Sequence, residues 1–335
     1  MAADLDYDAI AYPPTVIAEL SPDRMRAAGL FHGHVAPPLE TASVLEIGCG
    51  DALNLMGAAM AGPRGRHVGF DLSGEAIARA RALRDAAGLA EIDLHVGEIL
   101  AYPRAGEPFD YVLAHGVYAW TPPDVAEALL ALVAARLAPG GLAYVSFDCL
   151  PASAPKQALH RFLADETAGI ADATAKIARA RALIPLLAAH QHEGSRLKTM
   201  LDEIVDRLPG FGDGYFFHDY LSPHYHPASA ADFARAAARH GLKLIGDVGL
   251  ADLVDETLDA DARALLAGRG GDAGARLEAL DMLRGTQMFR RALLTRAGDA
   301  PPLKASATLT FSLEAERVAG EGHVVFIGRD GAEVR

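Results

Sequence analysis

The sequence has little cysteine and no long apolar run. Cys49 and Cys149 are its two cysteines, and neither stands in a CxxC or other metal-ligand pattern, so a disulfide scaffold is excluded. No stretch of about eighteen uncharged apolar residues occurs, which argues against a membrane span. The start, MAADLDYDAI, is acidic and lacks the basic and apolar regions of a signal peptide. These absences predict a soluble protein of the reducing cytoplasm.

Positive charge is also scarce. The chain has 31 Lys and Arg residues against 44 Asp and Glu residues, which gives a formal net charge of −13. A protein that binds a nucleic-acid backbone usually carries a basic stripe, so nucleic acid is not expected as a partner. The charge is compatible with a small cofactor or a protein substrate, because their binding needs only local donors.

The periodicity of the sequence indicates alternating strands and helices. Strands are expected at 43–47, 67–71, 92–96, 109–114 and 142–147, and later at 242–246 and 287–295. Helical patterns lie between them, and they include 229–240 and 251–284. This alternation predicts an α/β fold with a doubly wound, mostly parallel seven-stranded sheet that is covered on both faces.

Five segments follow from this pattern. They are an N-terminal arm and cap helix (1–40), an α/β core (41–150), a helical insertion that serves as a regulatory or substrate region (151–227), the last helix and strands of the sheet (228–300), and a tail (301–335). Within the insertion, 155–208 is rich in alanine and helical, whereas 209–227 is interpreted as an irregular loop rich in aromatic residues and histidine. In the tail, 307–314 and 322–328 alternate weakly and predict a terminal hairpin.

A glycine turn lies between the first expected strand and the helix after it. Residues 44–55 read VLEIGCGDALNL. Gly48 and Gly50 carry no Cβ atom, so the backbone can turn sharply and approach a ligand. The helix N-terminus that follows offers free N–H groups to a carboxylate or phosphate. Asp71 ends the next strand twenty-one positions after Gly50, where an acid accepts hydrogen bonds from ribose hydroxyls.

Two residues in and near this turn discriminate between nucleotide cofactors. A dinucleotide site requires a third glycine at position 53, where Leu53 stands. Glu46 would repel a pyrophosphate but suits an ammonium or sulfonium group. After the third strand, Glu98 can accept a hydrogen bond from an adenine amino group and Ile99 can cover the ring. The pattern favours S-adenosylmethionine, and a nicotinamide-dependent oxidoreductase stays the weakest alternative.

The run VLEIGCGD…VGFDLS…GEIL…FDYVLAHGVYAW resembles class I S-adenosylmethionine-dependent methyltransferases, which have a Rossmann-like fold. More narrowly, the chain resembles the bacterial protein-lysine methyltransferase family whose members carry a methyltransferase regulatory domain. The loop at 115–120 and the stretches at 217–247 and 280–294 carry this narrower likeness, which extends over roughly residues 7–300. The resemblance implies methyl transfer to a protein lysine. It also implies that the two strands flanking 251–284 close the sheet as a hairpin.

The expected cofactor contacts come from turns at the strand ends and from the arm. The backbone of His115 and Gly116 would touch the methionine part of the cofactor, and Tyr12 would close over it. Cys49 is interpreted as a small filler of the glycine turn, because no base is positioned to activate it. The cofactor-binding residues predicted in full are Tyr12, Glu46, Gly48, Cys49, Gly50, Asn54, Asp71, Leu72, Glu98, Ile99, His115 and Gly116.

Four residues are candidates for the substrate pocket. Tyr118 and Trp120 would wall it, because aromatic rings stabilise a sulfonium or methylammonium group. Asp148 ends the fifth strand and would contact the acceptor or its proton, and Tyr220 would reach the pocket from the aromatic loop. For each of these residues, a plain packing or turn role is the competing interpretation.

Metal binding is not predicted. The one cluster with metal-like chemistry contains histidines and an aspartate, but its spacing is irregular and no cysteine accompanies it. Its members are His218, Asp219, His224 and His226.

Two departures from the family pattern leave the acceptor open. The turn at 147–152 reads FDCLPA, where the family usually has a turn containing Asn-Thr, and 331–335 stands near the point where longer relatives continue into a winged-helix-like domain. The alternatives are therefore a small-molecule N- or O-methyltransferase and a non-catalytic methyltransferase-like binding subunit. The oligomeric state stays open.

Overall fold

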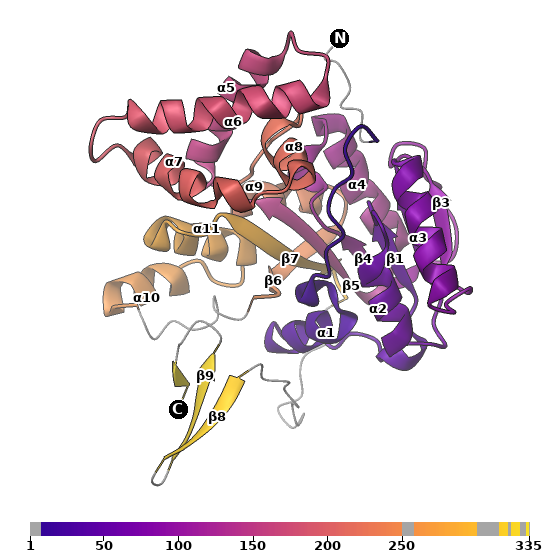
Figure 1. Ribbon diagram of the computed structural model, residues 1–335. Helices are drawn as coiled ribbons and strands as arrows, with labels where there is room; N and C mark the ends of the chain where they lie inside the picture. Colours follow the sequence, from indigo (N-terminus) through magenta and orange to yellow (C-terminus); the bar gives the residue numbers. More distant parts are fainter. Residues whose placement is uncertain (1–7, 250–257, 300–314, 321–322, 329–332, 335) are drawn as a thin grey trace. The chain divides into compact units, whose positions relative to one another are not determined.

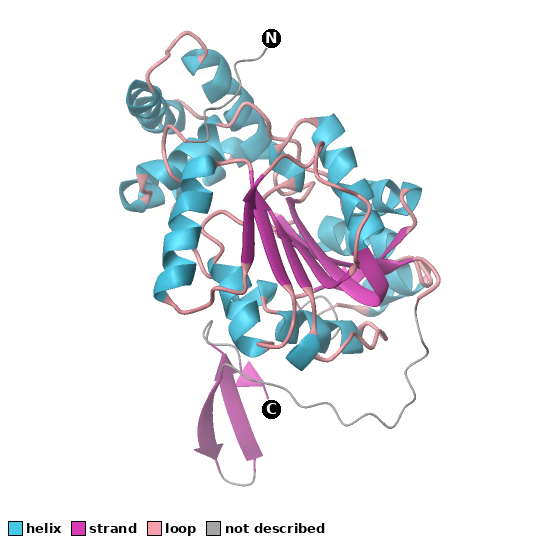
Figure 2. Cartoon of the chain, turned by 90° about the vertical axis from the view of Figure 1, so that its right-hand side faces the viewer, coloured by secondary structure: helices cyan, strands magenta, loops and turns pink. Residues whose placement is uncertain are grey.

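The computed structural model describes residues 8–249, 258–299, 315–320, 323–328 and 333–334. The chain divides into two units, residues 1–302 and residues 303–335, which are described separately. In the first unit, a twisted sheet lies between layers of helices, and further helices gather beyond one end of its strands (Figure 1, Figure 2).

Seven strands form the sheet of the first unit. They are β1 (Val44–Ile47), β2 (His67–Asp71), β3 (Asp93–Val96), β4 (Phe109–Ala114), β5 (Leu137–Asp148), β6 (Leu242–Asp247) and β7 (Phe289–Arg296). Their spatial order is β3-β2-β1-β4-β5-β7-β6. The first five pair in parallel, whereas β7 is antiparallel to both β5 and β6. This arrangement confirms the doubly wound, mostly parallel seven-stranded sheet and its closing hairpin.

Helices cover both faces of this sheet, which explains why its central strands are almost entirely apolar. On one face lie α4 (Pro123–Arg136), α9 (Ala230–Arg239) and α11 (Ala273–Arg284), and α10 (Ala260–Ala267) packs on α11. On the other lie α1 (Pro22–Phe31), α2 (Leu53–Ala61) and α3 (Gly74–Ala86). Alternate residues of a strand feed the two cores, as Leu45 and Val44 do in β1.

The ends of α3 follow from local chemistry. The Ser73 hydroxyl accepts a hydrogen bond from the Ala76 N–H at 2.9 Å, which satisfies one of the free donors of the first turn. Gly88, with φ +70°, then lets the chain leave the helix. At α1, the helix begins at Pro22, and the Ser21 side chain before it makes no capping hydrogen bond.

The helical insertion contains α5 (Ala154–Thr167), α6 (Ala173–Ala189), α7 (Arg196–Arg207) and α8 (Asp213–Leu221), which enclose an apolar core of their own. The prediction of an irregular loop over 209–227 was wrong for residues 213–221, which form α8. Phe216, Phe217 and Tyr220 are buried against α5 and α6. This packing outweighs the modest helix propensity of aromatic residues.

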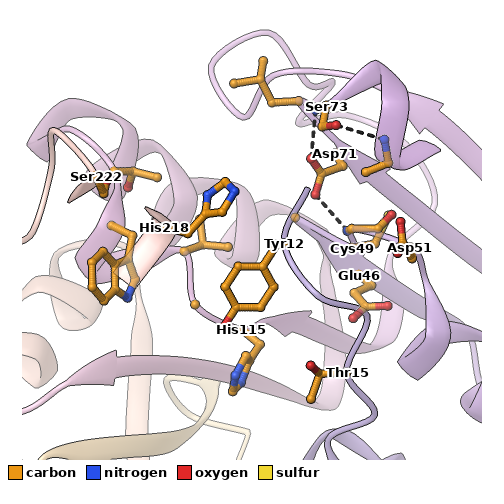
Figure 3. Close-up of a pocket in the computed structure, with 18 of the residues that line it drawn as sticks. Tyr12, Thr15, Glu46, Cys49, Asp51, Asp71, Ser73, His115, His218 and Ser222 are labelled. Carbon is orange, nitrogen blue, oxygen red and sulfur yellow. Dashed lines mark hydrogen bonds between the residues drawn. The ribbon is translucent and has the colours of Figure 1, made fainter. Parts of the chain in front are cut away.

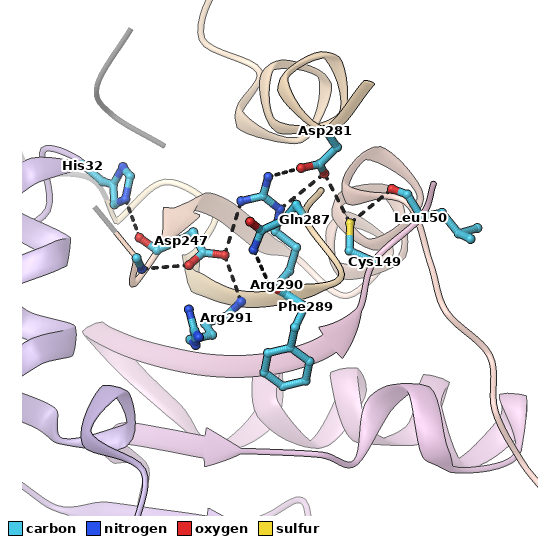
Figure 4. A network of polar contacts seen from close by, with 10 residues as sticks. His32, Cys149, Leu150, Asp247, Asp281, Gln287, Phe289, Arg290 and Arg291 are labelled. Atoms are coloured by element: carbon cyan, nitrogen blue, oxygen red, sulfur yellow. Dashed lines mark hydrogen bonds and ion pairs between the residues drawn. The ribbon is translucent and has the colours of Figure 1, made fainter. Parts of the chain in front are cut away.

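A buried ion pair network joins α11, β6 and β7 (Figure 4). The guanidinium of Arg290, 1% exposed, pairs with Asp281 and lies 3.5 Å from an Asp247 carboxylate oxygen. Asp247 also accepts the backbone N–H groups of Gly249 and Arg291 at 2.8 and 2.9 Å. The start of β7 is therefore fixed by charge as well as by the strand ladder.

In the second unit, β8 (Ala315–Gly320), β9 (His323–Gly328) and β10 (Glu333–Val334) form an antiparallel sheet in the order β10-β9-β8. The expected strand at 322–328 is present as β9, and the one expected at 307–314 lies outside the described residues. In the first unit, part of the helical prediction for 251–284 falls on 251–257, which are likewise not described. Among the described helices, none combines the length and the apolar character needed to cross a membrane.

Candidate functional site

The glycine turn after β1 has the strained geometry that its sequence predicts. Gly48 and Gly50 adopt φ values of +68° and +51°. A Cβ atom on Gly48 would come within 2.8 Å of the Val117 side chain, so only glycine fits there. Ala52, the residue before α2, also has a left-handed backbone with φ +55°, which is unusual for a residue with a side chain. The N–H groups of Gly48 and Cys49 donate to the Phe70 carbonyl, so the turn is held against the end of β2.

Asp71 lies beside this turn at the end of β2 (Figure 3). One carboxylate oxygen accepts the N–H of Gly50 at 2.8 Å, and the other accepts the N–H of Ser73 at 2.9 Å. Burial raises the pKa of Asp71 despite these two hydrogen bonds. Because a carboxylate oxygen has two lone pairs, each oxygen keeps capacity for a further donor such as a ribose hydroxyl.

Glu46 is the most unusual charge of the site. It lies in the middle of β1, is 3% exposed, and one of its carboxyl oxygens has no hydrogen-bond partner. Burial raises the pKa of Glu46 to about 8, although hydrogen bonds from the Leu55 backbone and the Asn54 side chain act in the opposite direction. An unpartnered buried carboxylate is unfavourable unless a cation or donor reaches it.

These groups line a cavity of about 800 Å³, which is within the size range of small-molecule sites. The cavity runs along the carboxyl ends of β1, β2 and β4 toward the helical insertion. All twelve residues predicted to bind the cofactor line it: Tyr12, Glu46, Gly48, Cys49, Gly50, Asn54, Asp71, Leu72, Glu98, Ile99, His115 and Gly116. The structure brings this set together, while their binding role stays a prediction.

His115 forms part of the cavity wall after β4. Its Nδ1 atom lies 2.9 Å from the Tyr144 hydroxyl and 3.3 Å from the Ser146 hydroxyl, and the Gly116 N–H donates to the same Ser146 oxygen at 2.9 Å. Burial, and then the nearby Arg291 guanidinium, lower the pKa of His115 to about 4. The ring is therefore neutral at physiological pH and does not repel a cationic ligand.

The N-terminal arm crosses the cavity between α2 and α8. The Ile17 N–H donates to the Asn54 side chain at 2.7 Å, and the His218 ring bonds to the Ile10 carbonyl at 2.7 Å. Tyr12 lies edge-on to the His218 ring at 5.5 Å, and its hydroxyl donates to Asp219 at 3.4 Å. Figure 3 shows Tyr12 between His218 and His115. The arm thus connects the sheet to the helical insertion over the cavity.

Two carboxylates, one buried and one partly exposed, mark the other end of the cavity. Asp148, the last residue of β5, accepts the Tyr225 hydroxyl at 2.5 Å and the Lys156 ammonium at 2.9 Å on the same oxygen. Asp219 lies 3.8 Å from that ammonium. Burial raises the pKa of Asp219 to about 6, against the lowering effect of Lys156. Near neutral pH, this group is poised to take up or release a proton.

Aromatic rings complete this end of the site. The Trp120 ring lies 4.4 Å from the Tyr225 ring and lines the cavity. The Lys156 ammonium lies 4.8 Å from the centre of the Trp120 ring and 4.9 Å from that of Tyr225. Carboxylates and ring faces together make a recess suited to an ammonium group.

The structure places only two of the four predicted pocket residues, Trp120 and Asp148, in the cavity lining. Tyr118 lies outside it, edge-on to Phe233 at 5.0 Å and to Phe147 at 6.0 Å, because the short helix at 118–120 directs it into the core of the sheet. Tyr220 is also outside, since its ring stacks at 5.0 Å on Phe216 within the insertion.

Sequence reasoning missed Lys156 and assigned Asp219 only to a doubtful metal cluster. Neither residue stands in a local motif, because α5 and α8 bring them to β5 from eight and 71 positions away along the chain. No group of three or more His, Cys, Asp or Glu side chains within the described residues is arranged to hold a metal ion.

Comparisons with known proteins agree with this geometry. Residues 44–141 match the family model described as a methyltransferase domain. The structure superposes on PKMT2 from Rickettsia typhi in complex with AdoHcy with a TM-score of 0.78, at 23% identity, over 95% of this chain and 64% of that chain. The chain therefore has the fold of class I methyltransferases, and its residues 44–141 match the methyltransferase domain model. Its glycine turn, Asp71 and Glu46 all fall inside the matched segment.

The relatives of this methyltransferase domain include longer proteins. An uncharacterized protein of Rickettsia prowazekii is 27% identical over 65% of this chain and 87% of its own length. A second protein of the same organism is 25% identical over 74% of this chain and 45% of its own length. A Synechocystis protein is 24% identical over 83% of this chain and 55% of its own length. The chain thus spans about half the length of the latter two relatives.

A second family model, described as a predicted methyltransferase regulatory domain, matches residues 212–296. This segment contains α8 and α9 and continues through β6 and α11 to β7. It therefore includes two strands of the methyltransferase sheet as well as the last helix of the insertion. From it, Tyr215, His218 and Phe289 reach the same cavity as the glycine turn.

Proposed function

We propose that this chain transfers the methyl group of S-adenosylmethionine to an amine, and that the acceptor is a protein lysine side chain. The observation that carries the proposal is the buried Glu46 carboxyl with one unpartnered oxygen at the wall of the cavity. Among the described residues, no cationic side chain is paired with this carboxyl, and a ligand ammonium would supply the positive charge.

The residues around Glu46 fit the rest of this cofactor. The N–H groups of the first turn of α2, which follows the glycine turn, suit its carboxylate. Asp71 retains acceptor capacity for a ribose diol, and Glu98 and Ile99 lie in the lining where an adenine would be covered. The bound cofactor supplies an activated methyl group on a sulfonium. The protein then has to orient the nucleophile and exclude water, and the arm across the cavity is placed to help with both.

The acceptor end of the cavity favours an amine over a hydroxyl or an anionic substrate. Asp148 and Asp219 are acidic, and Trp120 presents a ring face to the same space. Asp219, whose pKa is about 6, can take the proton that a lysine ammonium must lose before it attacks. The resemblance to the protein-lysine methyltransferase family supports lysine as the source of this amine.

A small amine is the second candidate acceptor. One contact supports it: the Tyr12 hydroxyl bonds to Asp219 across the cavity and narrows the approach for a protein side chain. The turn at 147–152, which departs from the family pattern, lies at the same end.

Two measurements test the proposal. Isothermal titration with S-adenosylmethionine and S-adenosylhomocysteine is expected to give heat with both, and the absence of heat with either would remove the proposal. Labelled-methyl transfer to a cell lysate, separated by molecular size, is expected to label protein. Label confined to the small-molecule fraction would replace the lysine acceptor with a metabolite.

A further inference from the structure

We propose that Lys156 of this chain is itself a methylation site, modified at Nζ by the chain's own active site. The inference rests on the proposed methyl transfer and goes beyond it by naming an acceptor inside the protein. It starts from the position of the side chain: Lys156 lines the same cavity as Glu46, Asp71 and His115.

Lys156 is held at the acceptor end of this cavity. Its side chain is 13% exposed, and its ammonium donates to Asp148, the residue that ends β5, at 2.9 Å. In open parallel sheets, the reacting ligands bind at the carboxyl ends of the strands, where His115 and Asp148 follow β4 and β5. The ammonium therefore lies at the strand edge where the reacting groups of such a fold are expected to meet.

The contacts of the Lys156 nitrogen leave room for methyl groups. Asp148 is its hydrogen-bond partner among the described residues, whereas Asp219 at 3.8 Å is beyond direct hydrogen-bond distance. The ring centres of Trp120 and Tyr225, at 4.8 and 4.9 Å, take up other sides of the group. A methyl group can replace an N–H that faces a ring without breaking a hydrogen bond, and the rings still attract the methylated cation.

The other lysines of the chain serve as internal controls for the methylation of Lys156. The sequence contains five lysines, at 156, 176, 198, 243 and 304. Of the four within the described residues, Lys156 is the one that lines the cavity. Lys198, for comparison, pairs with Asp202 on the surface of α7. Self-modification at the active site therefore predicts methylation of Lys156 alone. Nonspecific methylation predicts that the lysines outside the cavity are modified as well.

The chemistry balances with the groups present. The ammonium first loses one proton, through Asp148 or Asp219 to solvent, so that Nζ has a lone pair. A bond then forms between Nζ and the methyl carbon while the bond between that carbon and the sulfonium sulfur breaks. The sulfur leaves as a neutral thioether, and the positive charge passes to the methylated lysine. No oxidant, reductant or further reactant is required.

The test uses the full-length protein and S-adenosylmethionine that carries a trideuterated methyl group. Mass spectrometry of proteolytic peptides is expected to find trideuteromethyl increments on Lys156 and none on Lys198 or Lys243. Lys156→Arg is expected to lose the increment, and Lys198→Arg is expected to keep it. The measurement on the parent protein, which carries no substitution, does not depend on how well either variant folds.

A mixing experiment separates reaction within one chain from reaction between chains. The rate of modification is expected to be independent of protein concentration. An epitope-tagged Asp71→Asn chain, mixed with active protein at a cofactor concentration too low to load the variant, is expected to stay unmodified at Lys156. Modification of the tagged chain, or a rate that rises with concentration, would overturn a reaction at the chain's own site.

The controls distinguish failure of this inference from failure of the proposed function. Cofactor heat together with methyl transfer to lysate protein, but an unmodified Lys156, would overturn the inference alone. No cofactor heat and no transfer to any acceptor would overturn both. Increments on surface lysines ahead of Lys156 would also contradict the inference, because they would show adventitious methylation.

Discussion

The backbone N–H of Gly50 donates to the Asp71 carboxylate at 2.8 Å, so the last residue of β2 holds the turn that follows β1. The same carboxylate accepts the Ser73 N–H and faces the cavity. One side chain therefore joins two neighbouring strand ends and still offers acceptor capacity to a ligand. Its removal is expected to affect the turn and the ribose contact together.

We predict that Asp71→Asn weakens S-adenosylhomocysteine binding by about 10- to 100-fold, because charge-assisted hydrogen bonds to the ribose are worth about 1.5–3 kcal/mol. Isothermal titration measures the change. Asp93→Asn, on β3 and outside the cavity lining, is the matched control and should bind as the parent does. Unchanged affinity in an Asp71→Asn protein that melts like the parent would show that the carboxylate does not contact the ligand.

We predict that Glu46→Gln makes the ligand-free protein more stable at alkaline pH while it weakens cofactor binding. The pKa of Glu46 is raised from 4.5 to about 8. As pH rises between these values, the unfolded chain gives up this proton and the folded chain keeps it, so stability falls by up to about 1.4 kcal/mol per pH unit. The glutamine cannot ionise and does not lose this stability.

Denaturant unfolding of both proteins from pH 5 to pH 8 checks the prediction for Glu46. The difference between the two curves isolates this residue from other groups that titrate in the same range. The parent should lose stability relative to Glu46→Gln as pH rises. Parallel curves would mean that the carboxyl is solvated in the folded protein.

We predict opposite effects for the same substitution at two positions of the α2 region. Ala52→Gly removes a Cβ atom from a left-handed backbone, which relieves about 1–2 kcal/mol of strain, whereas Ala58→Gly within the helix costs about 1 kcal/mol. Both alanines are buried, so the loss of a methyl group largely cancels in the comparison. The unfolding free energies of the two variants should differ by about 2–3 kcal/mol, and equal values would show that the turn at 52 is unstrained.

We predict that Arg290→Met destabilises the protein by about 3–5 kcal/mol, because it removes the buried guanidinium that pairs with Asp281 and lies 3.5 Å from an Asp247 carboxylate oxygen. Adding Asp281→Asn to this variant should recover part of the loss, since one buried negative charge is removed. Denaturant unfolding of the single and double variants measures both effects. If the double variant is no more stable than the single one, the loss of stability comes from altered packing and not from buried charge.

Local patterns predicted the sheet well, and the twelve residues that they assigned to cofactor binding line one cavity. The spacing of Gly50 and Asp71 depends on two adjacent strands, so it is visible along the sequence. The acceptor half depends on side chains from α5 and α8, and no short-range pattern links Lys156 or Asp219 to β5. Tyr118 shows another limit: its neighbours in the same loop face the cavity, but a single short helical turn directs this ring into the core.

The prediction of a loop over 209–227 was wrong at 213–221 for a different reason. Phe216, Phe217 and Tyr220 repeat at helical spacing, but His218 and the flanking glycine and proline residues indicate a loop more strongly. Whether this segment forms a helix or a loop depends on its packing partners in α5 and α6, which are more than twenty residues away. Tertiary contacts therefore determined α8, as they often do where helix propensity is modest.

The reversed direction of β7 makes the site sensitive to length changes at one point of the chain. Because β7 is antiparallel to β5, it begins at the ligand edge, where Phe289 pairs with Asp148 and lies 5.4 Å from the His115 ring. Side chains alternate along a strand, so deleting one residue just before Phe289 would exchange its two faces and bring Arg290 toward the cavity. A deletion at the far end of β7, near Arg296, would leave that pairing in register.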